Sequence, residues 1–106
     1  MAYIAGSLAD GFVAIATGTI YTSAAKTIIR NLIFCNINAA PQTINLFITR
    51  SGGTRRQIYR FILAQWESVT TLSGGGVLLL ANGDIIEADT TTASAVSYVV
   101  GGATSA

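Results

Sequence analysis

The sequence predicts an all-β fold, a single antiparallel β-sandwich of jelly-roll type. Short segments rich in β-branched and aromatic residues recur about every 10–15 residues along a 106-residue chain, the length of one domain. Glycine, asparagine, serine and threonine cluster between these segments, and no convincing helical pattern intervenes. Regular strand spacing without helices is typical of a sandwich.

The first third of the chain predicts an arm or strand and then a central strand. Residues 1–18 are expected to be an N-terminal arm or a first strand, because Gly6 and Gly11 interrupt a helical pattern there. Segment 27–37, TIIRNLIFCNI, is largely apolar on both faces. That pattern is typical of a central strand covered on both sides.

A hairpin is expected in the middle of the chain. Residues 43–49 follow the turn that contains Pro41, and their alternation predicts a strand with one buried face. The residues of that face are Ile44, Leu46 and Ile48. Residues 51–54, Ser-Gly-Gly-Thr, have the composition of a hairpin loop, and 57–63 is expected to form the returning strand.

The last predicted strands lie at 77–80, 85–88 and 95–100. The three glycines at 74–76 are expected to form a flexible bend before the first of these strands. Asn-Gly-Asp at 82–84 has the composition of a tight turn that joins two antiparallel strands. The threonines at 90–92 are expected to form the final loop.

The sandwich domain is therefore expected to span residues 19–100. Residues 101–106 are rich in glycine and other small residues and predict a loose C-terminal tail.

The chain lacks most of the side chains that enzymes use. It has no histidine, one cysteine and five acidic residues. Without histidine, Ser-His-Asp and Cys-His arrangements and a conventional zinc site are impossible. Cys35 lies in an apolar run and is expected to be a small buried hydrophobic residue rather than a reactive thiol. We expect no catalytic residues and no cofactor.

Two segments have alternative interpretations as ligand sites. Asp84, Glu87 and Asp89 cluster in the sequence and their oxygens are suited to calcium. We expect no metal there, because Asp84 has a role in a turn and the other two share the face of a strand. The glycines at 74–76 lack the lysine and hydroxyl residue of a phosphate loop.

Only 10% of the residues are charged, against about 25% in an ordinary soluble domain. Such a surface is expected to be covered in part by other chains. The net charge of +1 argues against a nucleic-acid partner and against a membrane surface. No apolar stretch approaches the ~20 residues of a membrane-spanning helix, and the N-terminus lacks the basic start of a signal peptide.

The sharpest polar feature is a basic cluster around the predicted hairpin. It consists of Arg50, Arg55, Arg56 and Arg60. Arginine pairs with carboxylates in bidentate geometry, so the hairpin is a candidate for docking on an acidic surface of a partner. The alternative is a solvated hairpin tip whose charge keeps the chain soluble.

Aromatic residues are the other candidates for an interface. Trp66 is a candidate anchor for an interface or a sugar site, and its alternative role is to fill the core at the edge of the sandwich. Tyr3, Phe12 and Tyr21 are candidate anchors of an arm that reaches a neighbouring subunit, with local packing as the alternative.

An ordered set of features runs through residues 19–100. The set consists of Tyr-Thr-Ser-Ala-Ala-Lys-Thr at 21–27, Phe-Cys-Asn at 34–36, the alternating strand 44–48, the loop 51–54, the segment 79–86 and the last strand 96–100. In order and spacing these features resemble the small β-sandwich virion proteins of tailed bacteriophages. The segment 55–60 is more basic than that pattern leads one to expect.

The resemblance implies a non-enzymatic virion protein that is assembled in the host cytoplasm. Its expected role is that of a capsid decoration or cement protein, which bridges major capsid subunits and forms a dimer or trimer. Two alternatives stay open: a tail or head–tail connector accessory, and a receptor- or glycan-binding module that presents Trp66 or the tyrosines on an exposed ridge.

Overall fold

A computed structural model describes residues 3–72 and 77–105 of the chain. These residues form nine strands. None of the described residues belongs to a helix that is long and apolar enough to cross a membrane. The strands are β1 (Tyr3–Phe12), β2 (Gly18–Thr22), β3 (Thr27–Asn36), β4 (Gln42–Thr49), β5 (Arg56–Leu63), β6 (Ser68–Thr71), β7 (Leu78–Leu80), β8 (Ile85–Asp89) and β9 (Val96–Ser105).

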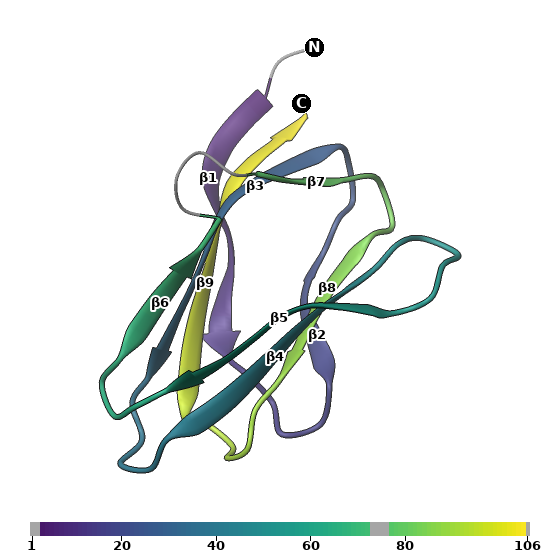
Figure 1. Ribbon diagram of the computed structural model, residues 1–106. Coiled ribbons are helices and arrows are strands. Elements are labelled where there is room, and N and C mark those ends of the chain that lie inside the picture. Colours follow the sequence, from purple (N-terminus) through teal and green to yellow (C-terminus); the bar gives the residue numbers. More distant parts are fainter. Residues whose placement is uncertain (1–2, 73–76, 106) are drawn as a thin grey trace.

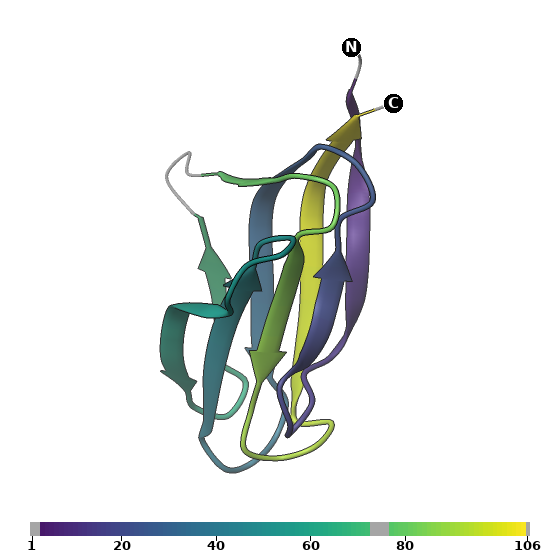
Figure 2. The same cartoon turned by 90° about the vertical axis from the view of Figure 1, so that its right-hand side faces the viewer.

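The strands form two antiparallel sheets that pack face to face (Figures 1 and 2). Sheet A has the order β1-β9-β3-β6, with β7 also paired to β3, and sheet B has the order β2-β8-β4-β5. β6 pairs with residues 32–35 and β7 with residues 27–29, so these two strands follow one another along β3. The predicted all-β sandwich is confirmed.

The strand order is that of a jelly roll. β4 and β5 form the innermost hairpin, and outward from it β3 pairs with β6 and β7, β2 with β8, and β1 with β9. These successive pairs lie in alternate sheets. The chain therefore folds as one long hairpin that wraps around a single core.

The core lies between the two sheets and consists mainly of aliphatic side chains. The predicted inward face of β4, Ile44, Leu46 and Ile48, is buried. Phe34 of β3 and Phe61 of β5 join the two sheets, with ring centroids 5.5 Å apart. Burying a large apolar side chain contributes about 1.5–3 kcal/mol, which is why alternation decides which face of each strand turns inward.

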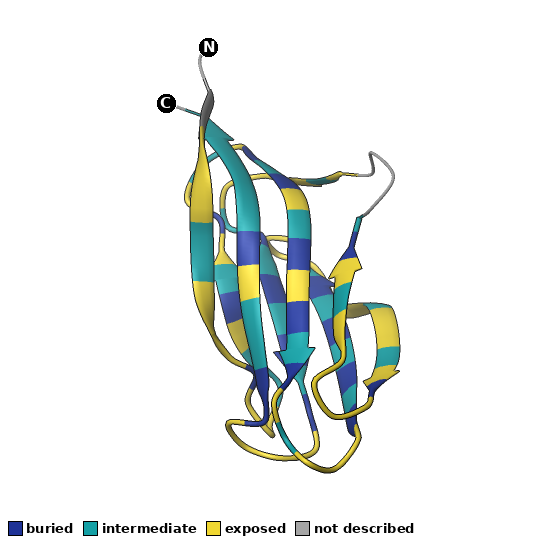
Figure 3. Cartoon of the chain, turned by 90° about the vertical axis from the view of Figure 1, so that its left-hand side faces the viewer, coloured by how far each residue is buried: buried dark blue, intermediate teal, exposed yellow. Residues whose placement is uncertain are grey.

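β3 lies inside sheet A as predicted, but only one of its faces is covered. Phe34 is fully buried, whereas Ile33 and Arg30 are exposed and Cys35 is partly exposed. The prediction that Cys35 is buried was therefore wrong. It failed because the side chains of a strand alternate, and within the described residues no layer covers the outer face of sheet A (Figure 3).

The C-terminal residues belong to the sandwich. β9 continues to Ser105 and lies between β1 and β3 (Figure 1). The prediction of a loose tail at 101–106 was wrong for residues 101–105. Small residues such as Gly102 pass close to the neighbouring backbone of β3, and this close approach extends the pairing. β1 pairs with β9 along its whole length, so the N-terminal segment is a first strand.

The turn at 82–84 does not join two paired strands, contrary to expectation. β7 belongs to sheet A and β8 to sheet B, so the turn carries the chain from one layer to the other. This crossing places Ile86 and Ala88 of β8 in the core. The hairpin loop at 51–54 is confirmed between β4 and β5. The glycine bend and the phosphate-loop alternative at 74–76 lie outside the described residues.

Candidate interaction surfaces

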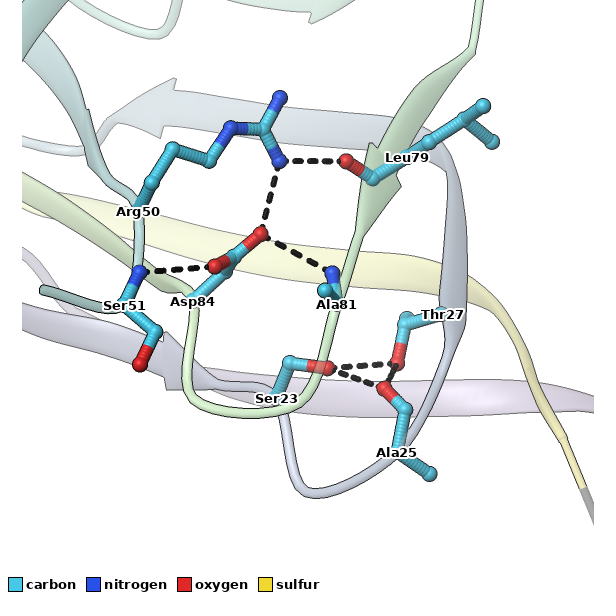
Figure 4. Close-up of polar contacts among 8 residues, drawn as sticks. All are labelled: Ser23, Ala25, Thr27, Arg50, Ser51, Leu79, Ala81 and Asp84. Atoms are coloured by element: carbon cyan, nitrogen blue, oxygen red, sulfur yellow. Dashed lines mark hydrogen bonds and ion pairs between the residues drawn. The ribbon is translucent and has the colours of Figure 1, made fainter. Parts of the chain in front are cut away.

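All four arginines of the basic cluster are exposed, but two of them, Arg50 and Arg55, form ion pairs within the chain. Arg50 lies at the end of β4, where its Nη1 donates hydrogen bonds to Asp84 Oδ2 at 2.8 Å and to the carbonyl of Leu79 at 2.7 Å (Figure 4). Its other terminal nitrogen points away from both partners in Figure 4. Arg50 therefore holds the hairpin loop against the β7–β8 turn.

Asp84 is the centre of this corner. Its side chain accepts hydrogen bonds from the backbone N–H groups of Ser51 and Ala81, each at 2.9 Å, as well as from Arg50. Only 3% of Asp84 is exposed. Burial raises the pKa of this carboxyl, but the hydrogen bonds from Ala81, Arg50 and Ser51 and the charge of Arg50 together hold it below the ordinary value of 3.8.

The neighbouring β2–β3 loop is attached to the same turn. The N–H of Gly83 donates to the carbonyl of Ser23 at 2.7 Å, and the N–H of Ser23 donates to the carbonyl of Asp84 at 2.8 Å. The hydroxyl groups of Ser23 and Thr27 share a hydrogen bond of 2.9 Å beneath this contact (Figure 4). Three loops that are distant in sequence thus form one rigid corner.

Arg55 forms the second ion pair. Its Nε and Nη2 donate to the two carboxylate oxygens of Glu87 at 3.2 and 3.0 Å, and its guanidinium carbon lies 5.7 Å from the centre of the Phe47 ring. Thr49 donates a further hydrogen bond of 2.9 Å to Glu87. The hydrogen bonds from Arg55 lower the pKa of Glu87 below its ordinary value of 4.5; burial opposes this, and Thr49 and the charge of Arg55 add to it.

Arg56 and Arg60 are exposed on β5, an edge strand of sheet B. The described residues offer neither of them an ion pair. No carboxylate of the described residues neutralises these two charges, which makes Arg56 and Arg60 candidates for an acidic partner.

The acidic residues that cluster in the sequence each accept hydrogen bonds from other side chains or the backbone. Asp89 accepts hydrogen bonds from Thr17 at 2.8 Å and from Asn45 at 2.7 Å, and Glu87 and Asp84 are engaged by arginine. No group of three potential ligands comes together in residues 3–72 and 77–105. Neutral and cationic donors instead satisfy these carboxylates on the outer face of sheet B and at its corner.

Trp66 is exposed, so the interpretation of this residue as a core filler was wrong. It lies in the turn between β5 and β6, with 67% of its surface exposed and a backbone φ of 62°. Its N–H donates to the carbonyl of Asn36 at 2.7 Å, and the N–H of Glu67 closes the turn on the carbonyl of Ala64 at 3.0 Å. Residues other than glycine rarely adopt such a φ, and a residue with a bulky side chain at this φ is an outlier.

The N-terminal aromatic residues lie in different surroundings. Phe12, at the end of β1, is more than half exposed on the outer side of sheet A, where it pairs in register with Ser97. Tyr21 is half-buried and packs against the core, in agreement with the local alternative. Tyr3 pairs with Ser105 through its strand, and its side chain lies outside the described part of the structure.

Several exposed apolar residues were not identified from the sequence. They are Ile15, Ile37, Ile62, Val77 and Leu79. Ile37 follows Asn36, the residue that binds the Trp66 backbone. The exposure of Ile62 and Leu79 could have been predicted, because side chains alternate along a strand and each of these residues adjoins a buried leucine.

Comparisons of this chain with protein-family models, with characterised proteins and with solved structures find no match.

Acidification is expected to destabilise the fold. The pKa values of Asp84 and Glu87 lie below their ordinary values of 3.8 and 4.5, so the ionised forms stabilise the folded chain above those values. This contribution is lost as the pH falls through the folded-state pKa values. The free energy of unfolding, measured with urea from neutral pH down to about pH 3, should fall with pH. The fall should be smaller in Glu87→Gln, which lacks one of the two carboxyl groups. A pH-independent stability in the wild type would contradict the assignment.

Proposed function

We propose that this chain is a non-enzymatic structural protein of a tailed-phage virion, a decoration or cement protein that binds the assembled capsid shell. The observation that carries the proposal is Trp66, a large aromatic residue that is exposed in a backbone conformation better suited to glycine. A positive φ disfavours a bulky side chain, so the backbone conformation does not account for tryptophan at this position. An aromatic side chain held outside the core is the typical anchor of a protein interface.

The exposed apolar residues support association with another chain. Trp66 and Ile37 lie at one end of β3, and Leu79 pairs in register with Ile28 near the other end. β3 has ten residues and so spans roughly 30 Å. The molecule measures 45 × 27 × 21 Å. An elongated protein with apolar contacts at both ends is suited to bridge two neighbouring subunits.

The mechanism would be thermodynamic. A protein that binds only the assembled shell stabilises the shell by mass action. Trp66 would supply the buried centre of one contact, and Arg60, on the strand that leads into the Trp66 turn, would pair with a carboxylate at its rim. The absence of histidine from the sequence agrees with a role that needs no acid–base chemistry.

Trp66→Gly is expected to separate binding from stability. The variant should weaken binding to shells that lack the protein by roughly 30-fold or more, the effect of losing an interface hot spot. Because glycine accepts a positive φ, the free energy of unfolding should stay constant or rise by up to about 1 kcal/mol. Co-sedimentation with shells and urea unfolding measure the two effects.

Ile62→Ala is the matched control, since it removes an equally exposed apolar side chain from a regular strand position. It should change shell binding far less than Trp66→Gly does. Full shell binding by Trp66→Gly would contradict the role of Trp66.

A glycan- or receptor-binding module is the second candidate, because it also requires Trp66 to be exposed. Aromatic rings stack on sugars, but such sites add polar groups that fix the hydroxyls. Here the neighbouring Ile37 is apolar, which favours a protein contact. A glycan array probed with the isolated protein distinguishes the two: binding that Trp66→Gly abolishes would favour the module.

A further inference from the structure

The rigid corner around Asp84 borders a cleft of about 530 Å³. Its walls come from the β2–β3 loop, β3, the β4–β5 loop, β7 and the residue after β7. The lining residues are Lys26, Thr27, Ile28, Arg50, Leu79, Leu80 and Ala81. A volume of this size lies within the range of sites that bind small ligands or a few side chains of a peptide.

The walls of the cleft are mostly aliphatic. Leu80 is almost fully buried and forms part of the floor, whereas Leu79 is 59% exposed at the mouth. Ile28 pairs in register with Leu79, so the two side chains lie on the same face of sheet A. An apolar group that entered the cleft would cover both.

Two cations accompany these aliphatic walls. Asp84 and the Leu79 carbonyl hold the guanidinium of Arg50 through Nη1, while its other terminal nitrogen points away from them (Figure 4). Lys26 is exposed and lies in the same lining. With Asp84 counted, the local formal charge is +1, which one carboxylate would neutralise.

The cation is also positioned in advance. Asp84 is fixed by the N–H groups of Ser51 and Ala81, so the guanidinium that it binds loses little additional freedom when a ligand arrives. A fixed guanidinium next to an apolar wall recognises a carboxylate that carries an aliphatic neighbour.

We infer that this cleft binds an acidic–aliphatic peptide segment of a partner protein, with a carboxylate at Lys26 and Arg50 and a leucine-like side chain against Ile28 and Leu79. The inference rests on the proposed function in one respect, namely that the partner is a protein. The cleft and the Trp66 turn lie toward opposite ends of β3, so the two contacts are independent.

The test is a titration of the ¹⁵N-labelled full-length chain with capped peptides, followed by NMR amide shifts. Ac-Leu-Glu-Leu-NH₂ should shift the amides at residues 26–28 and 79–81 in a saturable manner. Ac-Leu-Gln-Leu-NH₂ and Ac-Ala-Glu-Ala-NH₂ should bind more weakly, because each lacks one of the two recognised groups. Octanoate, a carboxylate with an aliphatic chain but no peptide backbone, should bind no better than the first peptide.

Two variants assign the contacts without disturbing the corner. Lys26→Ala should lower the affinity for Ac-Leu-Glu-Leu-NH₂ roughly threefold, the effect of one exposed ion pair. Leu79→Ala should lower that affinity by a similar factor, because apolar contact area is lost. Arg60→Ala removes the same charge from the edge of sheet B and should leave peptide affinity unchanged.

Equal binding of the glutamate and glutamine peptides, shifts confined to other residues, or no saturable shifts would overturn the inference. Tighter binding of octanoate would overturn the assignment to a peptide. None of these results would contradict the proposed function, because the shell-binding test depends on Trp66 at the other end of the sandwich.

Discussion

Replacement of Asp84 by alanine is expected to lower the free energy of unfolding by about 3 kcal/mol. The substitution removes the acceptor for two backbone N–H groups and for Arg50. Hydrogen bonds to a buried charged group are the stronger class, and their loss leaves the partner donors unsatisfied. The β4–β5 loop and the β7–β8 turn would lose their common attachment. Urea or thermal unfolding followed by circular dichroism measures the effect.

Asp10→Ala is the matched control, because it removes the same charge from an exposed position on β1. It should change the free energy of unfolding by no more than about 0.5 kcal/mol. Equal effects of the two substitutions would show that Asp84 is not the centre of a structural corner. A loss in the Asp84 variant that persists at low pH would identify contacts other than the ionised carboxylate as its source.

Gly102→Ala is expected to be the most disruptive small substitution in sheet A, with a loss of about 3 kcal/mol or more, the upper range for overpacking. A methyl group at this position would collide with the backbone carbonyl of Ile28 on the adjacent β3. Backbone atoms cannot move aside as a side chain can, so the β3–β9 pairing would have to separate locally. Thermal unfolding of the variant measures the loss.

Two other glycines of the same sheet provide controls. At Gly101 the new methyl group meets the amide end of the Asn31 side chain, which can rotate away. At Gly6 no atom lies within 4 Å of it. Alanine at either position should therefore be tolerated with little loss of stability. If Gly102→Ala is as stable as these two variants, β9 does not lie as close to β3 as described.

The sequence was sufficient to predict the fold where alternation and turn composition agreed. Residues 43–49 alternate strictly, and their inward face in β4 was confirmed. β2 and β6 were missed because they are short and rich in threonine and serine, with no apolar run to indicate a strand. Their place in the sheets depends on pairing with β8 and β3, which are distant in sequence.

The candidate sites were predictable in composition but not in geometry. The arginines of 50–60 were identified as one cluster, yet Arg50 and Arg55 bind Asp84 and Glu87 more than thirty residues later in the chain. Local sequence does not reveal such partners, since the fold must first bring the β4–β5 loop beside β8. The positive φ of Trp66 follows from the turn that Asn36 holds, and composition carries no signal for it.

The proposed virion role is tested most directly by quantitative mass spectrometry of purified particles of a phage whose genome contains this sequence. A decoration protein that clamps shell subunits should be present in hundreds of copies per particle, in a fixed ratio to the major capsid protein. Roughly a dozen copies or fewer would instead assign the chain to the tail or the connector. Its absence from the particle would contradict the structural role altogether.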